Sequence, residues 1–583
     1  MNSYHYDRRR PLEQTDEYAL REYPKPTSTT NATQRMTYDS IYESVTELYD
    51  RKRAWDKLVT VGDRESLNVA EEALGRHGDS EETGLRLRDF ETGSNKTYSF
   101  AELNAASNRV ANYLAENAGP RDRIAAMLPA QLELYAAAYG TIKAGRVYVP
   151  LAPLFGPEAL QYRLADSGSS VLVTTSKHVS KLDGEAVPAL ETVLVVDGTD
   201  GLDLDDRPDG IDIESYDVVR RSGAAFRSVE THPSDTYAIK YTSGTTGQPK
   251  GCPSTHEGAI RLHSYLEHVV DVQPTDSYFV AASPAWSYGF TAGMLAAGLR
   301  GTAAGCYRGP FDPEQLLETF EEFDVTNAMV PPTGLRKLRA SSVSPDDYDI
   351  DLRVLVSAGE SLDESTVEWC DDAFGTRPLD AYGQTESGMV VANYPFPDWE
   401  IKPGSMGKPV PGYKVMLLDE DGTDVGIGEV GEIAVKRGEN TRTSGYWRGP
   451  EASLTAYSGL WWRTGDLAKR DEDGYFWYVS RADQVIISAG YRIGPEEVEE
   501  TLMKHAAVEE VAVVGAPHET RGSIVKAVVV PTSSSTPSDA LASDLQSFAR
   551  SRLSKHEYPR EIDFVDELPK TSSGKIKRSE LEA

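Results

Sequence analysis

A run of eleven residues rich in glycine and hydroxyl groups, YTSGTTGQPKG at positions 241–251, constrains this chain more than any other feature. It contains three glycines, three threonines and one serine, and it begins just downstream of Tyr237-Ala-Ile-Lys. Glycine allows positive φ and close approach of the backbone, so successive N–H groups can point at one anion. The hydroxyl groups add donors, and Lys250 adds a positive charge. We therefore interpret the run as a loop that binds a triphosphate.

The same run departs from the Walker A pattern, because Gly247 is followed by Gln248 and Pro249 and not by Lys-Ser/Thr. A flexible Ser/Gly linker is the alternative interpretation. Linkers rarely combine Thr-Thr-Gly with Pro-Lys-Gly, so the phosphate-binding loop is favoured.

The acidic composition limits the partners of the chain. Among its 583 residues 92 are acidic and 60 are basic, so the formal net charge is −32, and the acids are spread along the whole length. Nucleic-acid binding needs a basic face, so we expect no nucleic-acid partner. A dispersed acidic surface keeps a protein soluble where salt screens charge, which favours a halophilic source over an acidic mesophilic enzyme. The length itself predicts two or more domains.

The cysteines and the apolar segments predict a cytoplasmic protein without a membrane span. Cys252, Cys306 and Cys370 are widely spaced and include no CxxC pair. We expect neither a disulfide framework nor a zinc site, and therefore a reducing cytoplasm. The most apolar stretch, residues 289–306, is rich in glycine and alanine and is interrupted by Arg300. We expect it to form a buried, tightly packed helix.

Strand-like and helix-like segments alternate along most of the chain. Residues 1–35 are polar and aperiodic, and we expect a disordered leader there. Residues 101–117 and 131–143 have apolar residues at helical spacing, and residues 123–128 between them read as a buried strand. This alternation predicts an α/β fold with largely parallel sheets covered by helices, and residues 197–217, rich in Asp and Gly, predict a solvated surface excursion.

The pattern changes after Asn393. Short β segments alternate with Asp-Gly turns at residues 421–422 and 473–474, which predicts a small antiparallel barrel or sheet. Residues 483–583 return to mixed helix and strand patterns, with Pro495 at the first turn of a helix. The C-terminal region is therefore expected to be a compact α/β unit.

Four further segments accompany the glycine-rich run. They are AYGQTE at 381–386, RTGD at 463–466, SRAD with GYRI at 480–483 and 490–493, and PKTSSGK at 569–575. In this order the five segments resemble the signatures of the adenylate-forming superfamily, which includes acyl- and aryl-CoA synthetases, peptide-synthetase adenylation domains and luciferases. The resemblance covers residues 60–583, and it looks closest to the branch of medium-chain acyl-CoA and acetyl-CoA synthetases.

The resemblance also implies a domain organisation. It places a large N-terminal AMP-binding domain at residues 36–482, with two parallel-sheet α/β subdomains and a small β-barrel. A small, mobile α/β cap domain would follow at residues 483–583. Asp483 falls at the hinge between these domains. Gly490 falls where the pantetheine arm of coenzyme A passes, and a side chain there would block the tunnel.

The reaction implied by the resemblance has two halves. A carboxylate attacks the α-phosphorus of ATP and gives acyl-AMP and pyrophosphate, and the thiol of coenzyme A then attacks the activated carbonyl and releases AMP. The first half brings two anions together, so the site must supply positive charge and aligned donors. The expected ligands are a small carboxylic acid, ATP with Mg²⁺, and coenzyme A. The sequence indicates no oligomeric state.

The roles of individual residues follow from the matching signatures. Lys575 corresponds to the catalytic lysine that bridges the carboxylate and the α-phosphate, and Arg492 corresponds to an arginine that contacts phosphate. Glu386 offers a hard oxygen for Mg²⁺, and Asp466 can accept bonds from both ribose hydroxyls. Tyr382 would lie against adenine, with a tyrosine packed in a core as the alternative. The residues expected to bind ATP or AMP are Thr242, Ser243, Gly244, Thr245, Thr246, Gly247, Lys250, Gly359, Glu360, Ser361, Tyr382, Gln384, Thr385, Asp466 and Arg481.

Basic residues are concentrated near the C-terminus, where Lys570, Lys575, Lys577 and Arg578 stand in an otherwise acidic chain. We expect this local positive charge to serve the adenylation step, with a solvated basic tail as the alternative. For single acids and arginines, a surface salt bridge is the usual alternative.

The acyl group is constrained by one substitution and one aromatic segment. Acetyl-specific members of the branch carry Trp-Trp before Gln-Thr-Glu, and the second Trp closes the acyl pocket. Gly383 stands at that place here, which predicts a pocket open to several more carbons. Trp286, Ser287 and Tyr288 occupy the segment that lines the acyl pocket, and two aromatic residues could also enclose a planar acid such as benzoate.

We therefore expect an ATP-dependent, AMP-forming acyl-CoA synthetase for a short- to medium-chain fatty acid. The enzyme alternatives are an aryl-CoA ligase, an acetyl-CoA synthetase, and a stand-alone adenylation enzyme that feeds a carrier protein. The alternative outside enzymes is an inactive adenylate-binding regulator. Retention of Lys575, Glu386 and Asp466 argues against that last reading.

Overall fold

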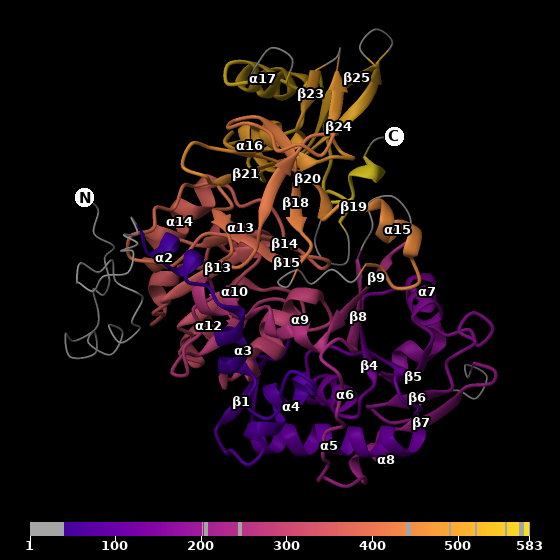
Figure 1. The fold of residues 1–583 in the computed structure, drawn as a ribbon. Coiled ribbons are helices and arrows are strands. Elements are labelled where there is room, and N and C mark those ends of the chain that lie inside the picture. The colour runs from indigo at the N-terminus through magenta and orange to yellow at the C-terminus, as the bar shows by residue number, and fades with distance from the viewer. Residues whose placement is uncertain are drawn as a thin grey trace, which may run out of the picture. The chain divides into compact units, whose positions relative to one another are not determined.

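The computed structural model describes residues 40–200, 202, 208–242, 248–438, 445–488, 491–518, 522–553, 557–570 and 576–581 (Figure 1). The leader expected at residues 1–35 lies outside them. The chain divides into two compact units. The first comprises Met1–Pro403, Gly407–Lys414 and Lys436–Ala456, and the second comprises Gly404–Met406, Val415–Val435 and Tyr457–Ala583. The second unit thus takes in most of the β-rich region after residue 393, and the domain boundary between residues 482 and 483 stays a prediction.

A seven-stranded sheet of the first unit has the strand order β7-β6-β5-β3-β4-β8-β9. Its neighbouring strands run parallel except for the antiparallel hairpin of β8 and β9. β4 and β5 are buried throughout, as is typical of strands in a parallel sheet. The strands are β3 (Arg123–Met127), β4 (Val147–Leu151), β5 (Ser169–Thr174), β6 (Thr192–Val195), β7 (Asp212–Ser215), β8 (Thr236–Thr242) and β9 (Lys250–Thr255).

Helices fill the connections of this sheet as the apolar spacing predicts. α5 (Phe100–Asn117) and α6 (Leu132–Lys143) pack against each other, and both confirm the sequence prediction (Figure 1). The prediction for residues 197–217 was partly wrong, because β7 forms there and pairs in parallel with β6. The further helices of this region are α7 (Pro157–Ser167) and α8 (Asp217–Arg220).

The second sheet of the first unit has nine strands in the order β16-β15-β14-β13-β12-β10-β11-β1-β2. The strands from β14 to β1 in this order pair in parallel, and the outer pairings are antiparallel. The strands are β1 (Thr83–Asp89), β2 (Ser94–Ser99), β10 (Tyr278–Val280), β11 (Ala304–Arg308), β12 (Asn327–Met329), β13 (Val354–Ala358), β14 (Leu379–Gln384), β15 (Gly388–Ala392) and β16 (Lys408–Pro409). Helices α12 (Pro313–Glu322), α13 (Pro332–Ala340) and α14 (Glu364–Phe374) follow β11, β12 and β13 and bury Leu316, Leu335 and Val367 in one core.

The apolar stretch 289–306 is only partly the helix that we expected. A π-helix (Gly289–Leu295) continues into α11 (Ala296–Arg300), and both are almost wholly buried. Gly301 then adopts φ 70°, which ends the helix, and Ala304–Arg308 forms strand β11. No helix within the described ranges is long and apolar enough to cross a membrane. The remaining helices of the first unit are α2 (Ile41–Glu47), α3 (Arg51–Leu58), α4 (Val69–Ala73), α9 (His256–Ile260), α10 (His263–His268) and α15 (Pro450–Thr455).

The second unit contains two five-stranded sheets. One is the small antiparallel sheet predicted after residue 393, and it consists of β17 (Val415–Leu418), β18 (Val430–Lys436), β19 (Tyr457–Ser458), β20 (Trp461–Arg470) and β21 (Phe476–Arg481). The other consists of β22 (Ile486–Ser488), β23 (Tyr491–Ile493), β24 (Val508–His518), β25 (Gly522–Pro531) and β26 (Glu561–Phe564). Helices α16 (Pro495–Met503) and α17 (Asp539–Arg550) cover the latter sheet through a core that includes Val498, Leu545 and Val513. The predicted α/β architecture is therefore confirmed.

Candidate active site

The glycine-rich run joins the two strands of the β8–β9 hairpin. Thr242 at the end of β8 pairs with Lys250 at the start of β9, so the two ends of the loop lie side by side. The side chain of Lys250 is exposed, as a phosphate ligand requires. The predicted ligands between them, Ser243, Gly244, Thr245, Thr246 and Gly247, lie outside the described residues.

Other parts of the first unit hold this hairpin in place. The hydroxyl of Tyr241 donates to Asp166 Oδ2 at 2.6 Å, and the backbone N–H of Trp447 donates to the carbonyl of Gly251 at 2.7 Å. The indole N–H of Trp447 also donates to the backbone carbonyl of Asp166, at 3.1 Å. The base of the predicted phosphate loop is therefore tied to α7 and to the segment before α15.

Glu386, the predicted Mg²⁺ ligand, lies in the turn between β14 and β15. Its Oε1 accepts a hydrogen bond of 3.1 Å from the hydroxyl of Tyr446, and the ammonium of Lys250 lies 4.9 Å from the centroid of the same tyrosine ring. The structure thus brings the predicted metal ligand and the lysine of the glycine-rich run to one side chain. Tyr446 was missed from the sequence, where the aromatic pair Tyr446-Trp447 after Gly445 was its only signal.

Cys252 lies beneath this group on β9. Burial raises the pKa of its thiol well above the ordinary value, and the carboxylate of Glu386 raises it further. A thiol with a raised pKa stays protonated and is a poor nucleophile.

The residues around Glu386 fit a magnesium ion that arrives with the nucleotide. Within the described part of the chain, no three or more His, Cys, Asp or Glu residues gather as a metal site would require. Mg²⁺ typically binds one or two carboxylates and completes its shell with substrate phosphates and water. A single carboxylate beside the phosphate hairpin matches that donor set.

The residues predicted to enclose adenine lie on β14 and after β13. Tyr382 is half-buried on β14. Two further predicted nucleotide ligands follow it, since Gln384 ends β14 and Thr385 begins the turn that carries Glu386. Gly359 adopts φ 101°, a conformation that favours glycine, and an added Cβ there would meet no atom within 4 Å.

The two residues after Gly359 are tied to helix α13. The carboxylate of Glu360 is paired with Arg336 at 2.8 Å and accepts the hydroxyl of Thr333. Arg336 also donates to the carbonyl of Ser361 at 3.1 Å. The side chain of Glu360 therefore anchors this turn, whereas Gly359 leaves open space beside it.

The predicted acyl segment lies before the π-helix. The ring of Trp286 meets Phe155 edge-on, with 5.7 Å between centroids. The hydroxyl of Tyr288 shares a hydrogen bond of 2.8 Å with the hydroxyl of Tyr265. Both aromatic side chains and Ser287 are half-buried.

The backbone at Gly383 lies close to the neighbouring strand β15. A Cβ added at Gly383 would lie 2.2 Å from the carbonyl oxygen of Gly388 and 2.7 Å from the Cα of Met389, both on β15. The β14–β15 pairing shifts register at this point, which brings the two backbones together. No indole closes a pocket here, but a larger residue could be introduced only by moving β15. Whether Gly383 lines the acyl pocket stays a prediction.

The predicted ribose ligand belongs to the second unit and has its own charge network. Asp466 on β20 is 5% exposed, and Arg481 on β21 donates to its Oδ1 at 3.0 Å. Arg481 also contacts Asp483 Oδ1 at 3.3 Å. Burial alone would lower the pKa of the Arg481 guanidinium, but the carboxylates of Asp466 and Asp483 raise it overall. The predicted hinge residue Asp483 is therefore linked to the ribose ligand through Arg481.

Three further predicted site residues are Arg492, Lys575 and Gly490. The backbone of Arg492 pairs with Ile487 in the β22–β23 ladder. Lys575 and Gly490 lie outside the described residues. Their roles stay predictions.

Three of the basic residues near the C-terminus pair with acids, and their expected part in the adenylation step stays a prediction. Lys570 pairs with Glu510 at 2.7 Å, and Lys577 pairs with Glu580 at 2.8 Å. Arg578 donates to both carboxylate oxygens of Glu499, at 2.8 and 2.7 Å. The pairs of Lys570 with Glu510 on β24 and of Arg578 with Glu499 on α16 hold the segment onto the second unit, whereas the pair of Lys577 with Glu580 stays within the segment.

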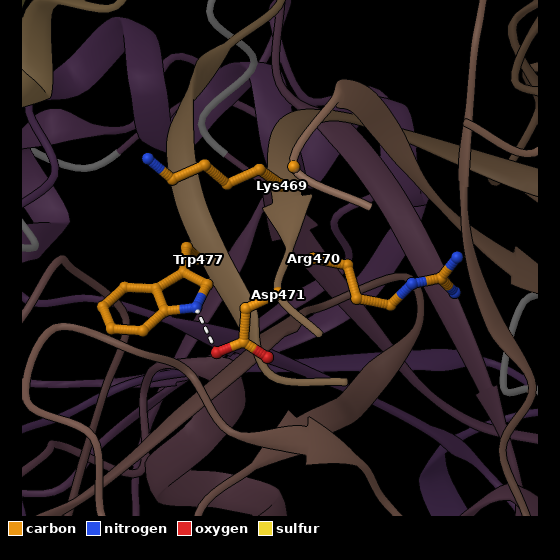
Figure 2. Close-up of a pocket in the computed structure, with 5 residues that line it drawn as sticks. Lys469, Arg470, Asp471 and Trp477 are labelled. Carbon is orange, nitrogen blue, oxygen red and sulfur yellow. Dashed lines mark hydrogen bonds between the residues drawn. The ribbon is translucent and has the colours of Figure 1, made fainter. Parts of the chain in front are cut away.

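An open hollow of about 440 Å³ lies on the small antiparallel sheet of the second unit. Figure 2 shows Lys469 and Arg470 pointing apart, with the indole N–H of Trp477 donating to Asp471 Oδ2 at 3.2 Å. Arg470 is also paired with Asp424 at 3.3 Å. The hollow contains none of the predicted site residues, and we assign it no part in the reaction.

Two family models match successive parts of the chain. Residues 72–447 match the family model described as AMP-binding enzyme, and residues 497–575 match the AMP-binding enzyme C-terminal domain. The chain is 35% identical over 527 residues to the acetyl-coenzyme A synthetase of Bacillus subtilis (strain 168), covering 89% of this chain and 90% of that protein. It is 32% identical over 540 residues to the mitochondrial acyl-coenzyme A synthetase ACSM3 of Rattus norvegicus, with the same two coverages of 89% and 90%.

A solved structure shares the fold. The chain matches the crystal structure of the anthranilate CoA ligase AuaEII in complex with anthranoyl-AMP with a TM-score of 0.80 and 28% identity. The match covers 91% of this chain and 98% of that chain.

Proposed function

Because this chain belongs to the family of AMP-binding enzymes and is an ATP-dependent, AMP-forming acid–CoA ligase, we propose that its acid is a short- to medium-chain fatty acid. In the first half-reaction a carboxylate oxygen bonds to the α-phosphorus of ATP, and pyrophosphate leaves. In the second half-reaction the sulfur of coenzyme A bonds to the acyl carbon, and AMP leaves.

The observation that best supports the proposed ATP site is that Lys250 and Glu386 both contact the side chain of Tyr446. ATP is a polyanion, so its binding requires fixed positive charge and donors at the loop. Lys250 supplies an exposed cation at the end of the hairpin. Glu386 offers a carboxylate for the ion that ATP brings, and a bound Mg²⁺ would neutralise phosphate charge there.

The second unit contributes the ribose-binding and catalytic residues in this proposal. Asp466, oriented by Arg481, would accept hydrogen bonds from the ribose hydroxyls. Lys575 and Arg492 would stabilise the charge that develops at the α-phosphate, Asp483 would act as the hinge, and Gly490 would leave space for pantetheine. The family resemblance supports these four roles.

The fatty-acid assignment is supported by the acyl segment and by position 383. Trp286 and Tyr288 are half-buried aromatic side chains that can enclose an apolar tail. Gly383 carries no indole, and the close approach of β15 would resist one. Two of the relatives are named for acetyl and acyl substrates. On these grounds we propose an aliphatic acid, with an aryl acid as the alternative because an anthranilate CoA ligase shares the fold.

The compartment is part of the same proposal. Cys252, Cys306 and Cys370 are all buried free thiols. Such thiols persist in a reducing environment, where disulfides are rare. We place the enzyme in the cytoplasm on this ground.

The substrate experiment measures kcat/KM for acetate, butyrate, hexanoate, octanoate and benzoate, with and without coenzyme A. We expect the highest value between butyrate and octanoate, with acyl-CoA and AMP formed only when coenzyme A is present. A maximum at acetate or at benzoate would refute the fatty-acid assignment.

A variant pair tests the acyl segment. Trp286→Leu should move the preference towards longer acids, by about 1–3 kcal/mol of transition-state discrimination for each methylene gained. Trp369→Leu is the matched control, because Trp369 packs on Phe374 in another core of the first unit. The same change of substrate preference in both variants would show that Trp286 does not line the acyl pocket.

A further inference from the structure

Tyr446 contacts two of the predicted ATP-site groups with different parts of one side chain. Its hydroxyl donates to Glu386 Oε1 at 3.1 Å, and its ring lies 4.9 Å from the ammonium of Lys250. The phenol and the carboxylate are 60 residues apart along the chain, so only the fold brings them together. A phenol can restrain a carboxylate by a hydrogen bond and a cation by the face of its ring.

The segment that carries Tyr446 is itself well anchored. The backbone N–H of Tyr446 donates to Ser453 Oγ at 2.7 Å, and this hydroxyl in turn donates to the carbonyl of Gly449 at 2.7 Å. The next residue, Trp447, is bonded through its backbone N–H to Gly251 and through its indole N–H to the backbone of Asp166. The backbone that carries the tyrosine ring is therefore bonded to the phosphate hairpin and to α15.

We propose that Tyr446 is a positioning residue for the ATP-binding step, which orients Glu386 through its hydroxyl and Lys250 through its ring. This inference rests on the proposed function of Glu386 and Lys250. The hydrogen bond fixes the direction in which the Glu386 carboxylate faces, and the ring face attracts the Lys250 ammonium. Both groups are then oriented before ATP and its metal ion arrive.

The test separates the two parts of the side chain. Tyr446→Phe removes the hydroxyl and keeps the ring, whereas Tyr446→Leu removes both. The affinity for ATP is measured by calorimetry once with EDTA and once with saturating Mg²⁺. AMP, which lacks the β- and γ-phosphates, is titrated in parallel.

We expect Tyr446→Phe to bind ATP like the wild type in EDTA but to lose about 3–10-fold of affinity in Mg²⁺. Tyr446→Leu should be weakened in both conditions, by about 3–10-fold already in EDTA, because Lys250 loses its aromatic partner. AMP affinity should change less than twofold in either variant. In steady state, KM for ATP should rise more than kcat falls.

The controls distinguish positioning from folding. Tyr348→Phe and Tyr348→Leu are matched variants, since Tyr348 is half-buried in another core of the first unit. Thermal melting of every variant reports folding independently of ligands. Wild-type affinity in both conditions for Tyr446→Phe, or equal losses for the Phe and Leu variants, would overturn the inference.

Failure of the proposed function would look different from failure of the inference. If the wild type itself bound no ATP in either condition, the assignment of Lys250 and Glu386 would be refuted. If the wild type bound ATP and Tyr446→Phe matched it, only the role of Tyr446 would be refuted.

Discussion

The site roles of Lys250 and Glu386 could be predicted from the sequence, whereas the role of Tyr446 could not. Lys250 and Glu386 stand inside segments whose residue order resembles known signatures, so both were predicted, and the structure brings them to one place. Tyr446 stands in no such segment, and its importance depends on a contact across 60 residues. Residues defined by a local motif can be predicted from sequence, whereas residues defined by tertiary contact cannot.

The role of Lys575 gives the first prediction. Lys575→Ala should abolish acyl-AMP formation and leave thioester formation from supplied acyl-AMP within a few-fold of wild type, because positive charge at the α-phosphate is needed only in the first half-reaction. The two half-reactions are measured separately, as pyrophosphate release and as acyl-CoA formation. Lys577→Ala is the control, since Lys577 is paired with Glu580. Equal loss of both half-reactions in Lys575→Ala would contradict the assignment.

Asp380, two residues before Tyr382 on β14, gives a prediction about pH. Burial raises the pKa of its carboxyl to about 8, although the backbone N–H of Ala381 acts in the opposite direction. In the unfolded chain the carboxyl titrates near pH 4, so between about pH 4 and pH 8 the folded protein holds the extra proton. Its contribution to stability therefore falls as pH rises through this window and is constant above it.

Asp380→Asn mimics the neutral carboxyl and should remove this dependence. We expect the variant to match the wild type near pH 4.5 and to gain about 2–5 °C in Tm at pH 8.5. Asp372→Asn, at an exposed position on α14, controls for the loss of one acid. Parallel Tm profiles for wild type and Asp380→Asn would show that Asp380 does not hold a proton in the folded state.

At the scale of elements, periodicity predicted the long amphipathic helices best. α5 and α6 begin and end within one residue of the ranges expected from apolar spacing. The secondary structure of the apolar stretch 289–306 was harder to predict, because an apolar composition indicates that a segment is buried but does not distinguish a helix from a strand. Its helix ends at Gly301 for a local backbone reason, and the rest joins the nine-stranded sheet. β7 was missed because a short edge strand in an Asp- and Gly-rich segment has no apolar period.

The start of α5 offers a test of local helix specification. Ser99 Oγ accepts the backbone N–H of Glu102 at 3.1 Å, and Glu102 accepts the N–H of Ser99 at 2.9 Å, which together form a capping box. Ser99→Ala should lower the free energy of unfolding by about 1 kcal/mol. For a unit of this size that loss lowers Tm by about 1 °C. Ser99→Asp keeps an acceptor at this position and should retain most of the stability. An unchanged Tm in Ser99→Ala would mean that tertiary packing alone determines where α5 begins.

At the scale of the whole molecule, the dominant property is charge. The chain has a net charge of −32, so its acidic side chains repel one another at low ionic strength, and dissolved salt screens that repulsion. We expect Tm and kcat/KM to rise as KCl increases from low to molar concentration. Sucrose at matched osmolality is the control, because it is excluded from the protein surface but does not screen charge. Full stability and activity in salt-free buffer would contradict a halophilic adaptation.

The central claim is that this enzyme activates a carboxylic acid as an acyl-adenylate before coenzyme A takes part. The most direct measurement is the exchange of labelled pyrophosphate into ATP with each acid of the panel and no coenzyme A. The account predicts acid-dependent exchange for fatty acids of short to medium length, and release of AMP, never ADP, once coenzyme A is added. No exchange with any acid, or formation of ADP and phosphate, would contradict it.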